Sequence, residues 1–181
     1  MVWVDAEYAG PLAVLSAWLT ALLPWNITYS SLADSGWVLF VRFPFAELQY
    51  TAGFSDDVDG FAARSVFRAI SLQSGLGLET ATFVWGASAL VVLVGLGFSV
   101  VYYFNETRLE AAPIHPVRIM GGLLGLAAAG FAVATGFVWT GGFGGVPIPI
   151  GVVLMALLAT VLLRATVTPA ADHDATGGAD H

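Results

Sequence analysis

Charged residues are absent from three long stretches of this chain, each dominated by apolar side chains. The stretches lie between Glu7 and Asp34, between Glu79 and Glu106, and between Arg118 and Arg164. A helix of about 20 apolar residues crosses the hydrocarbon core of a bilayer, which is about 30 Å thick. Each stretch is long enough to do so, and the pattern therefore predicts helices that span a membrane.

The third stretch is too long for a single helix. Glycines and prolines between Gly141 and Pro149 divide it and predict a turn there. Pro24 lies inside the first stretch, and we expect it to kink a helix that continues to about Tyr29. Four helices with mostly short connections predict an all-α membrane protein, an antiparallel bundle within one domain at residues 1–166. The expected transmembrane helices cover about 11–31, 80–104, 117–139 and 148–164.

Residues 33–78 form the one long region outside these spans. From Phe45 to Thr51 the side chains alternate between two faces, and a proline precedes them, which predicts a short extended or β-hairpin-like segment on the membrane surface. The alternatives are a re-entrant segment or a fifth span over 36–54. A span would place Arg42 and Glu47 in lipid, where charged side chains are costly.

An amphipathic interfacial helix is expected from about Gly60 to Leu72, with Asp59 as its N-cap. Asp56 and Asp57 precede that aspartate, so a metal ion held by the three carboxylates is a second interpretation. Their spacing lacks the pattern and the distal glutamate of a calcium loop. We therefore predict no metal site.

The composition supports a membrane protein and indicates its setting. Hydrophobic residues make up 57% of the 181 residues and charged residues only 10%, whereas a soluble domain has about 25% charged residues. The six basic residues are all arginine, and thirteen acidic residues bring the net charge to −7. An acidic chain without lysine is what we expect in very high salt, where like charges repel weakly. The acidic tail, 167–181, is expected to be disordered.

The same composition excludes several classes of function. No cysteine is present, which removes disulfides, thiolate nucleophiles and iron–sulfur clusters. There is no basic patch to neutralise phosphates, so we expect no nucleic-acid partner. The expected spans contain no charged residue, and no catalytic motif stands out. We therefore predict a protein that is not an enzyme and has no cofactor.

Two sets of residues are candidates for a specific role. Gly121, Gly125 and Ala129 are spaced four apart and make a small-residue stripe that would allow another helix to approach closely. Asn26, Arg42 and Glu47 form a candidate polar site, because intramembrane polar and charged residues mark transport paths and these three would lie on one if the hairpin entered the membrane.

The arginines indicate the orientation of the chain in the cell membrane. Arg108, Arg118 and Arg164 lie close to helix ends in short segments, where the bias of positive charge toward the cytoplasm is strongest. This distribution predicts a multi-pass protein with both termini in the cytoplasm and residues 33–78 outside.

The segments Leu22-Leu23-Pro24-Trp25-Asn26 and Phe40-Val41-Arg42-Phe43-Pro44 are the most distinctive parts of the chain. With them, the chain from Met1 to about Leu163 resembles a family of small haloarchaeal membrane proteins, conserved hypothetical proteins of unknown function. The resemblance implies a multi-pass membrane protein of an extreme halophile and brings no activity or cofactor.

These observations favour a non-enzymatic accessory or interaction protein, whose partners are the lipid bilayer and other membrane proteins or a second copy of itself. The alternative is a subunit of a small-solute transporter or channel. In that case Arg42 and Glu47 would enter the membrane on a re-entrant hairpin, and Asn26 and Trp25 would line a polar path.

Overall fold

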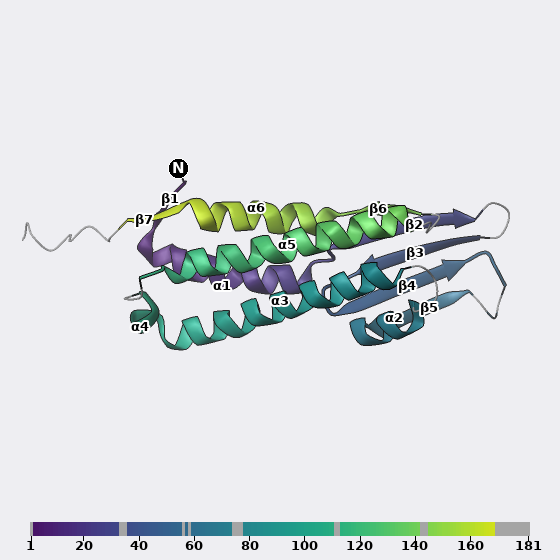
Figure 1. The fold of residues 1–181 in the computed structure, drawn as a ribbon, viewed down its shortest axis with the longest axis horizontal. Helices are drawn as coiled ribbons and strands as arrows, with labels where there is room; N and C mark the ends of the chain where they lie inside the picture. The colour runs from purple at the N-terminus through teal and green to yellow at the C-terminus, as the bar shows by residue number, and fades with distance from the viewer. Residues whose placement is uncertain are drawn as a thin grey trace, which may run out of the picture.

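The computed structural model describes residues 2–32, 36–55, 57, 59–73, 78–110, 113–141 and 145–168. Helices pack lengthwise into a bundle, and a β-sheet extends from one end of that bundle (Figure 1). The long helices are α1 (Ala6–Leu22), α3 (Glu79–Phe104), α5 (Pro116–Thr140) and α6 (Ile150–Arg164). The shorter helices are α2 (Val66–Gln73) and α4 (Glu106–Glu110).

The sheet has five strands in the order β5-β4-β3-β2-β6, and each neighbouring pair is antiparallel. Four of the strands follow α1, whereas β6 comes from the connection between α5 and α6, so the sheet joins the first part of the chain to the last. At the opposite end of the bundle, β1 (Val2–Asp5) pairs in parallel with β7 (Ala165–Thr168) (Figure 1). The five strands are β2 (Asn26–Leu32), β3 (Gly36–Arg42), β4 (Ala46–Ala52), β5 (Gly60–Ser65) and β6 (Val146–Ile148).

The prediction of an all-α fold is therefore wrong, and the first error falls at Pro24. We expected a kinked helix over 11–31, but α1 ends at Leu22 and the chain continues as β2. Proline cannot donate a backbone hydrogen bond inside a helix, and the segment after it is rich in residues that favour strands. The backbone N–H of Trp25 donates instead to the carbonyl of Arg42 at 2.8 Å, where the strand begins.

The prediction of four membrane-spanning helices is also wrong. Within the described ranges, α3 and α5 are long and apolar enough to cross a membrane by length and composition, whereas α6 and the apolar part of α1 are shorter. The bounds expected for the second and third helices, 80–104 and 117–139, are within one residue of those of α3 and α5 at both ends. The fourth was expected from 148, but Val146–Ile148 joins the sheet first.

The β-hairpin-like segment expected around Phe45 to Thr51 is present as β4 paired with β3, and this pair is the centre of a larger sheet. The helix expected from Gly60 is wrong in its first half, because Gly60–Ser65 pairs with β4 as β5 and α2 begins only at Val66. Asp59 is not a helix N-cap. Its carboxylate accepts the backbone N–H groups of Gly53 at 2.8 Å and Phe54 at 2.9 Å and so closes the β4–β5 turn.

The apolar core has one cluster at each end of the bundle. Where the bundle meets the sheet, the ring of Trp25 stacks on Phe131 with centroids 5.1 Å apart and tilts against Trp85 at 5.9 Å. Toward the other end, Met120 and Leu162 are fully buried among small residues of α1 and α6. The predicted disordered tail begins within β7, and its part at 169–181 lies outside the described residues.

Candidate functional site

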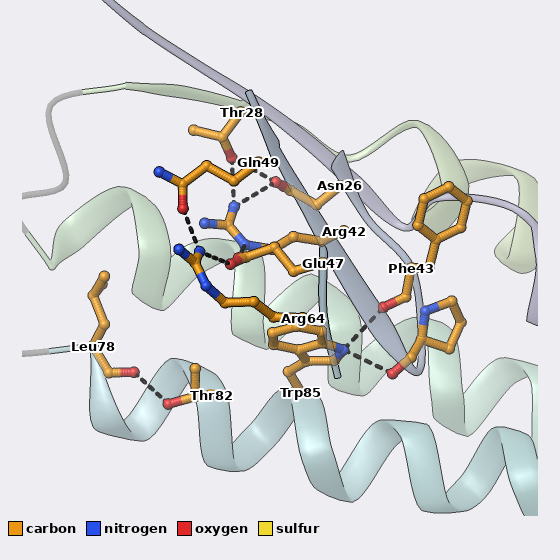
Figure 2. Close-up of polar contacts among 11 residues, drawn as sticks. Asn26, Thr28, Arg42, Phe43, Glu47, Gln49, Arg64, Leu78, Thr82 and Trp85 are labelled. Atoms are coloured by element: carbon orange, nitrogen blue, oxygen red, sulfur yellow. Dashed lines mark hydrogen bonds and ion pairs between the residues drawn. The ribbon is translucent and has the colours of Figure 1, made fainter. Parts of the chain in front are cut away.

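A row of polar side chains crosses four strands of the sheet. The strand register places Asn26 opposite Arg42, Arg42 opposite Glu47, and Glu47 opposite Arg64. Residues opposite each other on neighbouring strands point to the same face of a sheet, and here they converge above the N-terminal part of α3 (Figure 2). The three residues of the predicted polar site, Asn26, Arg42 and Glu47, therefore lie together.

The guanidinium of Arg42 is the centre of this group, which we call the Arg42 cluster: Asn26, Thr28, Arg42, Glu47, Gln49 and Arg64. Arg42 Nε donates to Glu47 Oε2 at 2.9 Å, and Nη1 donates to Thr28 Oγ1 at 2.8 Å and to Asn26 Oδ1 at 3.3 Å. The hydroxyl of Thr28 donates in turn to Asn26 Oδ1 at 2.6 Å. These four side chains belong to residues that are at most 2% exposed.

A second arginine approaches the same carboxylate from the edge of the sheet. Arg64 Nη1 lies 3.6 Å from Glu47 Oε1 and donates to the side-chain oxygen of Gln49. Its side chain is 27% exposed, so water reaches this end of the cluster. Two arginines thus flank one buried glutamate, and the cluster carries more positive than negative charge.

Burial sets the electrostatics of Arg42. Loss of water lowers the pKa of its guanidinium below the usual value, and the neighbouring Glu47 carboxylate, through its charge and its hydrogen bond, raises it in opposition. Arginine stays protonated in proteins, so Arg42 remains a buried cation. The ring of Phe40, 4.8 Å from Cζ of Arg42, adds a cation–π contact.

The cluster is attached to the helix bundle through the turn between β3 and β4. The indole N–H of Trp85 on α3 donates to the carbonyl of Pro44 at 2.9 Å and to that of Phe43 at 3.2 Å (Figure 2). Trp85 itself is buried against Trp25, the last residue before β2. Through Trp85, α3 therefore contacts both the start of β2 and the turn between β3 and β4.

These contacts indicate a structural role. The Arg42 guanidinium donates to Glu47, Thr28 and Asn26, and each oxygen of the Glu47 carboxylate lies beside an arginine. In the described part of the chain, no group of three histidine, aspartate or glutamate residues could hold a metal ion. Of the acidic run considered for a metal, Asp59 serves the β4–β5 turn and Asp56 lies outside the described residues.

The opposite face of the sheet has a different character. One registered row runs across all five strands through Phe61, Tyr50, Leu39, Tyr29 and Val146. At the two ends of the row, Phe61 is 66% and Val146 is 63% exposed, and Tyr29 and Tyr50 are 48% and 45% exposed. Large apolar groups are thus presented on the outside of the sheet.

A second row lies beside the first and contains Ala63, Leu48, Val41, Ile27 and Ile148. We call the two rows, together with Trp37, the outer sheet face. Every arginine and glutamate of the described strands β2 to β6 points to the other side, so the outer sheet face carries no charged side chain. The sequence reasoning missed this surface, because it had not recognised β2, β5 or β6 as strands.

The predicted helix-packing stripe meets α6 through its first two members. A β-carbon added to Gly121 would lie 3.0 Å from Leu162 Cβ, and one added to Gly125 would lie 3.7 Å from Ala159 Cβ. Ala129 is exposed. On the side of α5 toward α3, the tightly packed glycine is Gly130, where an added β-carbon would meet Ser88.

Comparison with known proteins gives a family without an assigned activity. Residues 2–167 match the model of a family of unknown function, DUF7549. The chain belongs to that family. No curated protein matches the chain in sequence. Because the match extends from β1 to within β7, both the bundle and the sheet are part of what defines DUF7549, and its function has to be argued from the structure.

Proposed function

We propose that this DUF7549 protein is a multi-pass membrane protein of an extreme halophile, with a non-enzymatic accessory or interaction role. In this proposal α3 and α5 cross the cell membrane, and α1 and α6 pack beside them. The sheet projects from the membrane as the part that meets a partner.

The observation that carries the proposal is the outward surface of α3 and α5. In an apolar segment of 18 consecutive residues, 33% of the residues of α3 and 44% of those of α5 are buried, although each helix packs against its neighbours. The outward side chains are large and apolar, such as Leu90 and Leu126, each 60% exposed. A core helix of a soluble protein would be mostly buried, whereas a helix that is apolar all round and half uncovered suits lipid.

The positions of the charged residues support the same arrangement. Glu79 begins α3, Arg118 lies in the first turn of α5, and Arg164 ends α6, so charges stand at helix ends. The buried Arg42 cluster lies in the sheet, above the N-terminal part of α3 (Figure 2). Indole and phenol groups also occur near helix ends, for example Tyr103 and Trp139, as in the aromatic belts of membrane proteins.

The extreme-halophile setting is supported by the acidic, lysine-free composition. The interaction role is supported by the uncharged outer sheet face, since a large exposed apolar surface typically marks an interaction site. For the transporter or channel alternative, Arg42 and Glu47 would have to line a path. In the described contacts they bind each other inside the sheet, and we do not favour that alternative.

Fractionation of cells tests the membrane proposal. We expect the full chain to stay with membranes after an alkaline carbonate wash and to be released by detergent. Recovery in the wash without detergent would contradict the proposal.

The absence of cysteine allows the orientation to be tested in the same cells. A cysteine at Ser55, beside the β4–β5 turn, should react with a membrane-impermeant thiol reagent in intact cells. A cysteine at Asn105, at the opposite end of α3, should react only after lysis. The reverse result would contradict the proposed orientation, in which the sheet lies outside the cell and both termini lie in the cytoplasm.

A further inference from the structure

The sheet departs from the usual distribution of side chains. An antiparallel sheet with one covered face normally turns its apolar residues toward the core and its polar residues toward water. Here the face toward the bundle carries Asn26, Thr28, Arg42 and Glu47, all buried, while the outer sheet face carries aromatic and aliphatic residues. A face of this composition is suited to being covered by another surface.

The size of the outer sheet face is sufficient for a protein interface. Five strands about 4.8 Å apart, with an average of about six residues per strand at roughly 3.3 Å per residue, give a footprint of about 500 Å², not counting the height of the side chains. Two such faces in contact would bury about 1,000 Å² or more, which reaches the lower limit for a specific interface. A patch of about 500 Å² is as large as the largest apolar patch of a typical soluble monomer, and such patches often have a function.

The aromatic residues of this face are already held in place by one another. The ring of Trp37 lies 6.0 Å from that of Tyr29 and 5.3 Å from that of Tyr50, centroid to centroid. Rings that are ordered before binding lose little conformational freedom on contact, and tyrosine and tryptophan commonly dominate binding energy at interfaces.

We propose that the outer sheet face is covered by the same face of a second copy of this chain, so that the protein is a symmetric dimer. This inference rests on the proposed function, because it names the partner of the interaction surface given there.

Charge favours a second copy over an unrelated partner. The chain has a net charge of −7, and the outer sheet face is the part of the sheet from which charge is absent. Two identical faces therefore meet without repulsion and without leaving any buried charge unpaired, whereas the surface of an ordinary soluble partner brings charged groups. A two-fold dimer, the commonest symmetric assembly, needs such a self-complementary face.

The direction of the strands also favours a second copy of the chain as the partner. The strands run along the same long axis as the helices (Figure 1). With α3 and α5 across a membrane, the faces of the sheet point sideways rather than away from the bilayer. Two copies anchored side by side in one membrane can then bring their outer sheet faces together, and sheets packed face to face align in this way.

Analytical ultracentrifugation of the full chain, purified in detergent, tests the proposal. The solvent density is matched to that of the detergent, so that the measured mass is that of the protein alone. We expect a dimer for the unaltered chain. The variant Tyr29→Glu/Tyr50→Glu places two carboxylates in the interface and should weaken dimerisation by about 100-fold or more. The control Ser55→Glu adds one carboxylate at an exposed position outside this face and should remain a dimer.

A second measurement does not depend on a variant that could fail to fold. With no native cysteine, single cysteines at Leu39 or Tyr50 should be joined between copies by a short bis-maleimide in native membranes, whereas a cysteine at Asp57 or Leu126 should not. Cross-linking at the control positions alone, a monomeric unaltered chain, or a dimer that persists in the double glutamate variant would each overturn the proposal. So would one equivalent of a different polypeptide bound to this face.

The two proposals fail in distinguishable ways. Release by carbonate would remove the membrane assignment but leave the dimer measurable. A monomer that still needs detergent would remove the dimer and leave the membrane assignment in place.

Discussion

Nε of Arg42 and Oε2 of Glu47 lie 2.9 Å apart, with side chains that are 3% and 1% exposed. They are directly opposite each other on β3 and β4, at the end of the hairpin whose turn carbonyls accept the indole N–H of Trp85. The pair therefore stands where the sheet is attached to the helix bundle, and its loss should affect the stability of both.

The first prediction concerns the charge of Glu47. Glu47→Gln leaves the buried Arg42 without its counter-ion, and breaking a buried pair in this way typically costs about 3–5 kcal/mol of the free energy of unfolding. Thermal or denaturant unfolding of the detergent-solubilised protein would measure the loss. The matched control is Arg64→Gln, which removes a partly exposed partner of the same carboxylate and should cost about 1 kcal/mol or less. Equal losses of unfolding free energy in the two variants would contradict the role of Glu47 as the counter-ion of Arg42.

Replacing both members of the pair should be milder than replacing one. In Arg42→Met/Glu47→Leu no buried charge is left unpaired, and apolar replacements of buried ion pairs are often close to neutral. We expect this double variant to recover most of the stability lost in Glu47→Gln. A double variant less stable than both single variants, Arg42→Met and Glu47→Leu, would show that the contacts of Arg42 with Asn26 and Thr28 matter more than its charge.

Gly151 is predicted to be intolerant of any side chain. A β-carbon added there would lie 2.7 Å from Cα of Trp25 and would also strike the carbonyl of Pro24, both of which are backbone atoms. Gly151→Ala should therefore push α6 away from the start of β2 and cost about 1–3 kcal/mol. Gly136→Ala on α5 is the control, because nothing lies within 4 Å of its added β-carbon. The same unfolding assay compares the two, and an unchanged Gly151→Ala protein would contradict the close contact.

Trp85→Phe keeps an aromatic ring in the core but removes the indole donor. The carbonyls of Phe43 and Pro44 would lose that hydrogen bond where water cannot easily replace it, at a cost of about 1–3 kcal/mol. Trp139→Phe makes the same chemical change on an exposed ring of α5 and should have little effect. Circular dichroism during denaturant unfolding gives both values. A larger loss in Trp139→Phe than in Trp85→Phe would contradict the role given to the indole N–H.

Sequence and structure agree best where a pattern is long. The charge-free stretches after Glu79 and after Arg118 gave α3 and α5 nearly at their predicted bounds, because more than 20 mostly apolar residues without a proline have few other ways to satisfy their backbone. The hairpin around Pro44 was also predicted, from alternation and a proline. Asn26, Arg42 and Glu47 were singled out as polar residues, although their role remains a hypothesis.

Tertiary structure decided the short elements. β2, β5 and β6 have seven residues or fewer, and a segment of that length becomes a strand only when a distant partner pairs with it. Ile27 illustrates this, since its strand lies between Val41 and Ile148, which are 14 and 121 residues further along the chain. The same pairing placed Arg42 and Glu47 on the buried face and Tyr29 and Tyr50 outside. By itself the sequence determined which segments avoid water, whereas the pairing of strands determined which side of the sheet each residue faces.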